Sequence, residues 1–281
     1  MARYIPDTKT ERWVIIASQR QERPFGVKKS DGCPFCSGNE HITPPEVFRI
    51  GSGEKDKQGW DVRVVPNLYA ITDIHEVVIH SPSHTADFDT LPLEQVVKIL
   101  KSYQKRIHAL RDKGNVVVFC NRNAQGGASL VHPHSQIVVI PKDIGIDIHG
   151  GEPVVNIVET NASFVTYCPD YSEWPFEMWI RPLREGKAFR DLEEKGADLL
   201  AISLKQGIAR LVAVYNDPAL SSLHTGVTFG YNFYLYDVSN WYLRIIPRFV
   251  YRAGFELATG LSVNIVDPAV AAELLKKASY I

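Results

Sequence analysis

The sequence predicts an α+β protein built from two similar halves, each an antiparallel sheet with one long helix. Short runs of β-branched and aromatic residues surround two long segments whose apolar residues recur with helical spacing. The order of strands and helix in the first half returns in the second, which indicates a duplication. Strand-rich halves that each carry one long helix are typical of α+β folds. We therefore expect the chain to divide into segments 1–150 and 151–281.

Three segments are expected to be helices. Residues 91–111 and 193–215 place apolar side chains three and four positions apart, as one face of a buried helix requires. The last helix has a clear start, because Asp267 is a good N-cap and Pro268 suits the first helical position. We expect it to run to Ala278.

The remaining regular segments are expected to be strands. Their apolar and aromatic runs are short and bounded by turn residues. They are Trp13–Ala17, Val62–Val65, Val77–His80, Val116–Cys120, Gln136–Ile140, Phe164–Tyr167, Glu177–Ile180, Asn232–Tyr236 and Tyr242–Ile246.

The duplication is indicated by two pairs of similar segments. The run that starts at Gln136 is echoed at Tyr242, 106 residues later, and Glu76 is matched to Glu177, 101 residues later. The second half lacks histidines at the positions that match His84, His132 and His134 of the first half. We therefore expect the working site in the first half.

Composition limits the partners. Lys and Arg total 31 and Asp and Glu total 32, so the net charge of −1 provides no general field for nucleic acid or an anionic membrane. No run of about 20 apolar residues is present, and a cytoplasmic protein is the expectation. Four cysteines in 281 residues do not suggest a disulfide scaffold, and Cys120 and Cys168 lie in apolar or aromatic runs typical of buried thiols.

Cys33 and Cys36 form a C-x2-C pair, the spacing of a zinc knuckle. His84 and His132 are available as two further nitrogen donors. The alternative is a redox dithiol, which should follow a strand and open a helix. The residues after Cys36 favour a loop instead. Zinc is therefore the preferred interpretation of the pair.

The segment His132-Pro133-His134-Ser135-Gln136 leads into an apolar strand. Residues two apart in a strand face the same side, and the proline restricts the backbone between the two histidines. The preceding loop, residues 121–129, is rich in amide, hydroxyl and glycine groups that can approach a phosphate closely. Chemistry alone leaves two interpretations open, a catalytic histidine or a zinc-binding H-x-H strand beside a structural loop.

Several motifs together carry a family resemblance along nearly the whole chain. They are Arg3-Tyr4-x-Pro6 with Trp13-Val14, Arg20-x2-Arg23-Pro24, Cys33-x2-Cys36-x-Gly38-Asn39, Val62-Arg63-Val64 leading to Asn67, Ser81-Pro82-x-His84, Asn121 through Ser129, and His132-Pro133-His134-x-Gln136-Ile137. The set resembles the galactose-1-phosphate uridylyltransferase family, a branch of the histidine-triad superfamily. Simple histidine-triad hydrolases carry a third histidine where Gln136 stands, so glutamine indicates a transferase or phosphorylase.

The resemblance implies two histidine-triad-like halves, of which the second is degenerate and lies on the sugar side. It implies one structural zinc per chain, held by Cys33, Cys36, His84 and His132. His134 would be the nucleophile that attacks the α-phosphorus of a nucleotide sugar, with Gln136 and Ser129 holding the phosphoryl oxygens. Further residues would bind substrate: Arg20 and Arg23 as cations, often across a homodimer interface, Asn67, Asn121, and Glu256 at a sugar hydroxyl. The reaction implied is ping-pong transfer to a hexose 1-phosphate, within galactose metabolism.

Some residues depart from the uridylyltransferase pattern. Ser135 stands where those enzymes usually have glycine, and Leu68 follows Asn67 where they usually have an aspartate near the ribose. Leu68 and the C-terminal run from Trp241 to Gly260 resemble the ADP-glucose phosphorylase branch more closely. A nucleotide-sugar phosphorylase, a dinucleoside-polyphosphate phosphorylase and a non-catalytic nucleotide-binding protein are therefore the alternatives. The residue types do not distinguish uracil from adenine, nor one sugar from another.

Overall fold

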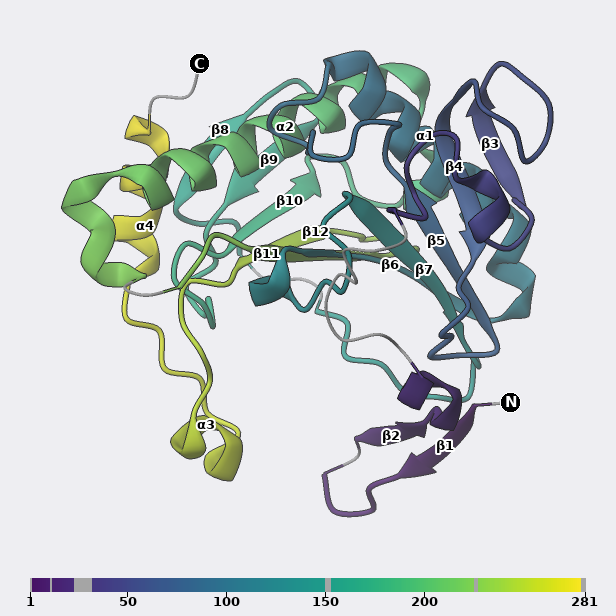
Figure 1. The fold of residues 1–281 in the computed structure, drawn as a ribbon. Coiled ribbons are helices and arrows are strands. Elements are labelled where there is room, and N and C mark those ends of the chain that lie inside the picture. The colour runs from purple at the N-terminus through teal and green to yellow at the C-terminus, as the bar shows by residue number, and fades with distance from the viewer. Residues whose placement is uncertain (1, 11, 23–31, 150–152, 225–226, 279–281) are drawn as a thin grey trace.

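The computed structural model describes residues 2–10, 12–22, 32–149, 153–224 and 227–278 (Figure 1). The expected division near residue 150 lies outside the described residues. The N-terminal strands β1 (Arg3–Pro6) and β2 (Trp13–Ile16) form a hairpin of their own. All other strands join one ten-stranded antiparallel sheet, in the order β3-β4-β5-β7-β6-β11-β12-β10-β9-β8.

The strands of this sheet come equally from the two halves of the chain. The first half supplies β3 (Phe48–Gly51), β4 (Trp60–Pro66), β5 (Ile74–Ile79), β6 (Asn115–Arg122) and β7 (His134–Ile140). The second half supplies β8 (Ile157–Thr160), β9 (Phe164–Tyr167), β10 (Met178–Pro182), β11 (Tyr231–Tyr236) and β12 (Leu243–Pro247). The helices are α1 (Leu93–Leu110), α2 (Glu194–Asn216), α3 (Gly254–Thr259) and α4 (Pro268–Lys277).

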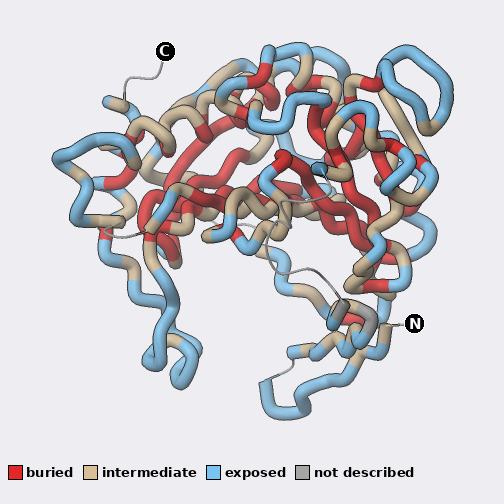
Figure 2. The backbone as a smooth tube through the Cα atoms, viewed as in Figure 1, coloured by how far each residue is buried: buried red, intermediate tan, exposed pale blue. Residues whose placement is uncertain are grey.

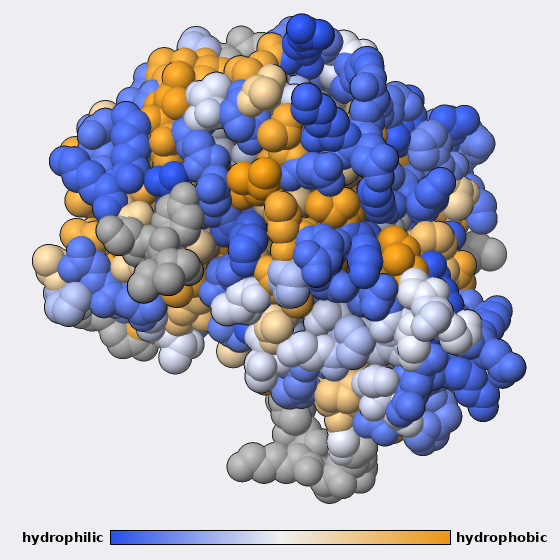
Figure 3. Space-filling model, turned by 90° about the horizontal axis from the view of Figure 1, so that it is seen from above, coloured by the Kyte–Doolittle hydropathy of each residue, from blue (hydrophilic) through white to orange (hydrophobic). Residues whose placement is uncertain are grey.

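The long helices α1 and α2 cover one face of the sheet, and the β1–β2 hairpin and α3 project on the opposite side (Figure 1). One continuous core lies between the sheet and the helices and joins both halves, since it includes Val118 of β6 and Phe233 of β11. The central strands of the ten-stranded sheet are deeply buried, whereas the N-terminal hairpin is largely exposed (Figure 2). The view from above shows a surface of mostly hydrophilic residues with scattered apolar ones (Figure 3). Within the described residues, no helix is both long and apolar enough to cross a bilayer.

The strand order confirms the α+β prediction and its repeat. Reading outward from the junction of β6 with β11, the sheet runs β6, β7, β5, β4, β3 on one side and β11, β12, β10, β9, β8 on the other. Each half places its long helix after its third strand in this sheet, α1 after β5 and α2 after β10. The two five-stranded halves are thus one continuous sheet rather than two separate ones.

One detail of the predicted repeat is wrong. Glu76 lies opposite Ile137, and Ile180 lies opposite Leu243. If Ile137 matches Leu243, as the spacing of 106 requires, then Glu76 matches Ile180 rather than Glu177. The contacts agree, because Glu76 pairs with Arg106 of α1 while Glu177 pairs with Arg244 on β12. The two glutamates are similar only in sequence.

The predicted elements otherwise match the structure. Each predicted strand overlaps an observed one, and the three predicted helices correspond to α1, α2 and α4. The Asp267 side chain caps α4 by accepting from the backbone N–H groups of Ala269 and Val270. Missed elements are β1, β3, β8 and α3. They are four to six residues long, and each shows partial or full exposure, so none has a strong apolar pattern.

The shared core predicts that the halves unfold together. Phe233→Ala should lower the free energy of unfolding by about 3–5 kcal/mol, because its buried ring would leave a cavity where the halves meet. Phe255→Ala, on exposed α3, is the control and should cost no more than about 0.5 kcal/mol. Urea unfolding measures both free-energy changes, and hydrogen exchange shows whether the two halves open together. Faster exchange confined to the second half would contradict the prediction.

Candidate active site and metal centre

A cavity of about 300 Å³ opens on the sheet face away from α1 and α2. Its floor is apolar and includes Val65 of β4 and Val77 of β5, with Phe35 and Leu130 from neighbouring loops. Five of the predicted site residues line it with polar side chains: His134, Gln136, Ser129, Asn67 and Arg20. An apolar pocket with a few converging polar groups is the usual form of a small-molecule site.

His134 begins β7, and its imidazole lines the cavity. The Nδ1 atom lies 2.8 Å from the backbone carbonyl oxygen of His132, to which it donates a hydrogen bond. That bond places a proton on Nδ1, so Nε2 carries the lone pair when the ring is neutral. The ring also packs edge-on against Phe35, with centroids 5.2 Å apart. The tautomer and the ring orientation are therefore both fixed.

Gln136 lies two residues along the same strand and lines the same cavity. Its Oε1 atom accepts hydrogen bonds from His75 Nε2 at 3.0 Å and from Asn67 Nδ2 at 3.4 Å. Asn67 is held in turn, because its Oδ1 accepts from the backbone N–H of Tyr69. The amide of Gln136 is thus part of a connected polar network beside His134.

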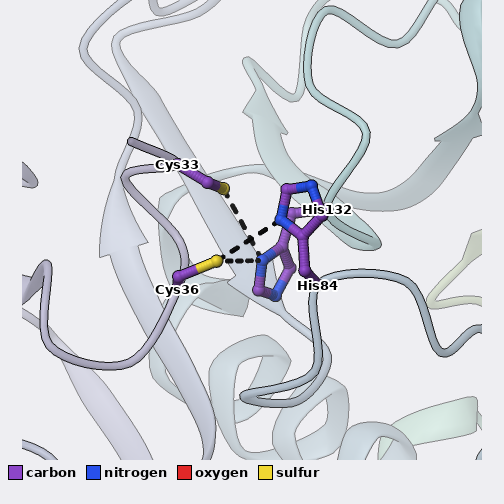
Figure 4. Close-up of side chains that lie close together, drawn as sticks. All are labelled: Cys33, Cys36, His84 and His132. Atoms are coloured by element: carbon purple, nitrogen blue, oxygen red, sulfur yellow. Dashed lines mark hydrogen bonds between the residues drawn. The ribbon is translucent and has the colours of Figure 1, made fainter. Parts of the chain in front are cut away.

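Cys33, Cys36, His84 and His132 converge on one centre (Figure 4). Their four donor atoms lie within 4.8 Å of one another. The closest sulfur–nitrogen separations are 3.3 Å for Cys36 and His84 and 3.6 Å for Cys33 and His132. Zinc bonds of about 2.0 Å to nitrogen and 2.3 Å to sulfur give tetrahedral edges of roughly 3.3–3.8 Å. The donor set therefore fits a four-coordinate metal ion.

The charges of the cluster also fit a metal ion. Burial and the neighbouring Cys33 thiol raise the pKa of Cys36 to about 11, so a nearby cation is needed to hold thiolate charge there. Burial lowers the pKa of His132 to about 4, so its ring is neutral at pH 7, the form that binds metals. The His132 Nε2 atom donates to the carbonyl oxygen of Ser81 at 2.9 Å, which leaves Nδ1 facing the cysteines.

The cysteine–histidine cluster borders the cavity, because Cys33 and His84 also line it. His132 precedes β7, is fully buried and turns toward the cysteines, whereas His134 and Gln136 line the cavity. The two imidazoles were expected on a common face, and both rings pack against Phe35, with centroids 6.1 Å away for His132 and 5.2 Å away for His134.

Arg122 links the two loops that carry the histidine ligands. Its guanidinium donates to the carbonyl oxygens of Val131 and Thr85, each adjacent in sequence to a ligand histidine. Its Nε lies 2.9 Å from the buried carboxylate of Asp87, which also accepts from the hydroxyl of Tyr231 at 2.7 Å. Since Tyr231 belongs to β11, the second half supports the cysteine–histidine cluster, to which its described residues contribute no donor atom.

The loop that carries the cysteines is fixed by buried polar contacts. Glu40 accepts from the indole N–H of Trp60 at 2.7 Å and from the backbone N–H of Gly38. Arg63, which is 1% exposed, pairs with Glu46 at 2.7 Å and with Asp56 at 2.9 Å. These contacts hold the loop onto β4, beside the cavity.

Ser135 points to the helix side of the sheet, between His134 and Gln136. Its hydroxyl lies 2.5 Å from the hydroxyl of Tyr103 on α1 and 2.6 Å from Nε2 of His80. All three side chains are fully buried, and burial lowers the pKa of His80 well below its usual value, so this ring is neutral. The network fastens β7 to α1 directly behind the cavity. Glycine at position 135 could not make this contact.

The remaining predicted residues have different positions. Asn121 bonds to the Asn232 amide at 2.8 Å, and Glu256 lies on α3, where it accepts from the backbone N–H of Ala253. Neither residue lines the cavity, so their substrate-binding roles stay predictions. Arg23 lies outside the described residues. His75 was not predicted from the sequence. It lies two residues before the cavity residue Val77, on the same face of β5, and β5 pairs with β7.

Comparison with known proteins agrees with the motifs. Residues 73–140 match the family described as galactose-1-phosphate uridyl transferase, N-terminal domain. ADP-glucose phosphorylase from Arabidopsis thaliana is 29% identical over 97% of this chain and 92% of its own. A galactose-1-phosphate uridylyltransferase from Thermotoga maritima is 27% identical over 62% of this chain and 64% of its own.

Solved structures give the same result. The crystal structure of Arabidopsis thaliana ADP-glucose phosphorylase with bound ADP-glucose has a TM-score of 0.75 and 26% identity, covering 99% of this chain and 100% of that one. A uridylyltransferase structure has the same TM-score at 22% identity and 99% coverage of this chain, which shows the shared fold. The resemblance to the galactose-1-phosphate uridylyltransferase family is therefore confirmed. The relatives are enzymes of the nucleotidyltransferase and phosphorylase type.

The donor set predicts one bound metal ion per chain. Cys36→Ser should abolish most of the binding, because a hydroxyl does not replace a thiolate at a tetrahedral site. Cys168→Ala removes a buried cysteine of the second half and should keep the full metal content. Elemental analysis of the purified proteins measures both. Equal metal in Cys36→Ser and the parent protein would contradict the assignment of the site.

Proposed function

We propose that this chain is a nucleotidyltransferase that cleaves a nucleotide sugar through a covalent nucleotidyl-histidine on His134. The hydrogen bond from Nδ1 of His134 to the carbonyl of His132 is the observation that carries the proposal. It gives Nε2 the lone pair of a neutral imidazole at the wall of the cavity. The first step forms a bond from Nε2 to the α-phosphorus and breaks the bond to the sugar phosphate, which leaves.

The second step regenerates the histidine. An acceptor phosphate oxygen attacks the same phosphorus, a new phosphorus–oxygen bond forms, and the phosphorus–nitrogen bond breaks. Charge on the transferring group would be offset by Gln136, Ser129 and Arg20, which line the cavity. The apolar floor suits the faces of the planar base, which need burial more than charge.

We propose zinc as the metal of the Cys33, Cys36, His84 and His132 centre. Two thiolates and two imidazole nitrogens in a closed tetrahedral arrangement are typical of structural zinc. Zinc there would supply folding energy and hold the cysteine loop against the segment that leads to His134. Because all four zinc ligands would come from the protein, we assign the reaction to His134 and not to the metal.

We also propose a role for each half of the chain and a homodimeric assembly. Residues 1–150 would carry the catalytic site and residues 151–281 the degenerate half. A homodimer is implied by the family resemblance, and Arg23 would then supply a phosphate-binding cation across its interface. The cytoplasm, a reducing compartment, would keep Cys33 and Cys36 available to the metal. Sedimentation equilibrium would test the assembly.

The covalent intermediate is directly testable. Incubation with UDP-glucose or ADP-glucose without acceptor should add one nucleoside monophosphate to the zinc-loaded protein, and His134→Gly should abolish the addition. His108→Ala, an exposed histidine on α1, is the matched control and should keep it. Intact-mass spectrometry at neutral pH detects the acid-labile product. Equal addition to His134→Gly would refute the proposed nucleophile.

Transfer to a hexose 1-phosphate is the first candidate for the second step. Phosphorolysis by inorganic phosphate is the second candidate, and a specific observation favours it. The Arabidopsis thaliana ADP-glucose phosphorylase matches 97% of this chain, whereas the Thermotoga maritima uridylyltransferase matches 62%. Leu68 lines the cavity, and a leucine in place of an aspartate at this position resembles the ADP-glucose phosphorylase branch.

The two acceptors can be separated by chasing the isolated adduct. Phosphate should release a nucleoside diphosphate if the protein is a phosphorylase, and galactose 1-phosphate should release a nucleotide sugar if it is a hexose-1-phosphate transferase. We expect a preference of at least about tenfold, since a site shaped for one acceptor leaves polar groups unpaired with the other. Chromatography of the products measures the preference. Equal rates would argue against a dedicated acceptor.

A further inference from the structure

His75 contacts Gln136 from behind the cavity lining. It lies on β5, is 4% exposed, and is not among the residues that line the cavity. It stands opposite Val138 and diagonal to Gln136 on the facing strand β7. Diagonal neighbours on one face of a sheet are within reach of long side chains. The contact from His75 Nε2 to Gln136 Oε1 measures 3.0 Å.

The proton on the His75 ring can be assigned from its neighbours. The backbone N–H of Ile71 donates to Nδ1 at 3.0 Å, so Nδ1 is an acceptor and carries no proton. The neutral ring must then carry its proton on Nε2. That N–H faces Gln136, so the atom it meets must be the amide oxygen.

The same oxygen receives a second donor. Asn67 Nδ2 lies 3.4 Å from Gln136 Oε1, so it and His75 Nε2 both donate to this oxygen. Asn67 Nδ2 also lies 3.1 Å from His75 Nε2, but a protonated Nε2 does not accept from it. The Asn67 amide is itself fixed, because its Oδ1 accepts from Tyr69 at 2.8 Å. Reversing the Gln136 amide would set its NH2 group against two other donors. The network therefore permits one orientation of this amide.

We propose that His75 is a positioning residue that turns the Nε2 amino group of Gln136 toward the phosphoryl group held beside His134. This rests on the proposed function, because the amino end can stabilise phosphoryl oxygens only if phosphoryl transfer occurs there. The side-chain amide of Gln136 has one donor end and one acceptor end. It needs a partner that selects the donor end. The backbone of Ile71 therefore acts on Gln136 through His75.

Two substitutions at position 75 form a matched test. Glutamine places its amide near the position of Nε2 of histidine, and asparagine places its amide near that of Nδ1. His75→Gln therefore retains a donor to Gln136, whereas His75→Asn retains only the acceptor for Ile71. Both are polar, and comparable thermal midpoints would show that both fold. The rate of His134 adduct formation with nucleotide sugar is the readout.

We expect His75→Asn to slow adduct formation about tenfold, since loss of a direct donor to developing charge costs about 100-fold or more. His75→Gln should stay within about threefold of the parent, and nucleotide-sugar affinity should change less than the rate in both. In a Gln136→Ala background, His75→Asn should cause no further loss. Equal loss in His75→Gln and His75→Asn, or additive losses with Gln136→Ala, would overturn the positioning role.

A second measurement does not depend on activity. Nitrogen-15 NMR of the labelled protein should show the ring of His75 protonated at Nε2, with the signal assigned by its loss in His75→Gln. A ring protonated at Nδ1 would overturn the inference even if the adduct forms. If the parent forms no adduct but the Nε2 tautomer is found, the proposed function fails while the orientation of Gln136 stands.

Discussion

The alternation of side chains along β7 is the constraint on which the site depends. His134 and Gln136 point into the cavity, and Ser135 between them points into the core against Tyr103 and His80. A shift of register by one residue would exchange the two sets, burying the imidazole and exposing the hydroxyl. The buried contacts of Ser135 oppose such a shift. Ser135, which has no proposed role in the reaction, thus keeps His134 and Gln136 facing the cavity.

Two of the polar side chains that line the cavity are each oriented by a buried partner. The His134 ring is oriented by a backbone carbonyl, and the amide of Gln136 by His75. The loops that hold the metal ligands are joined by Arg122, which the buried Asp87 anchors. Rigid placement of this kind lowers the reorganisation that a reaction requires, because the donors already face the reacting group.

The sequence predicts the elements with strong local signals. The C-x2-C spacing and the His-Pro-His-Ser-Gln segment identify both centres, because their residues are close in the chain. Local similarity misleads at Glu76 and Glu177, whose different partners follow from strand register. His75 and Asp87 could not be assigned roles, because they meet Gln136 and Tyr231 across 61 and 144 residues. Contacts of that range depend on sheet order, which no local pattern encodes.

The pairing of β6 with β11 has a consequence for any attempt to separate the halves. These strands lie in the middle of the sheet, and their paired residues include Cys120 with Phe233 and Val118 with Leu235. Cutting the chain between the halves would turn both into long, apolar edge strands. Unprotected edges of this kind recruit other chains and aggregate. A gene fragment encoding the first half alone should therefore yield insoluble protein, even though it carries every ligand of the metal centre.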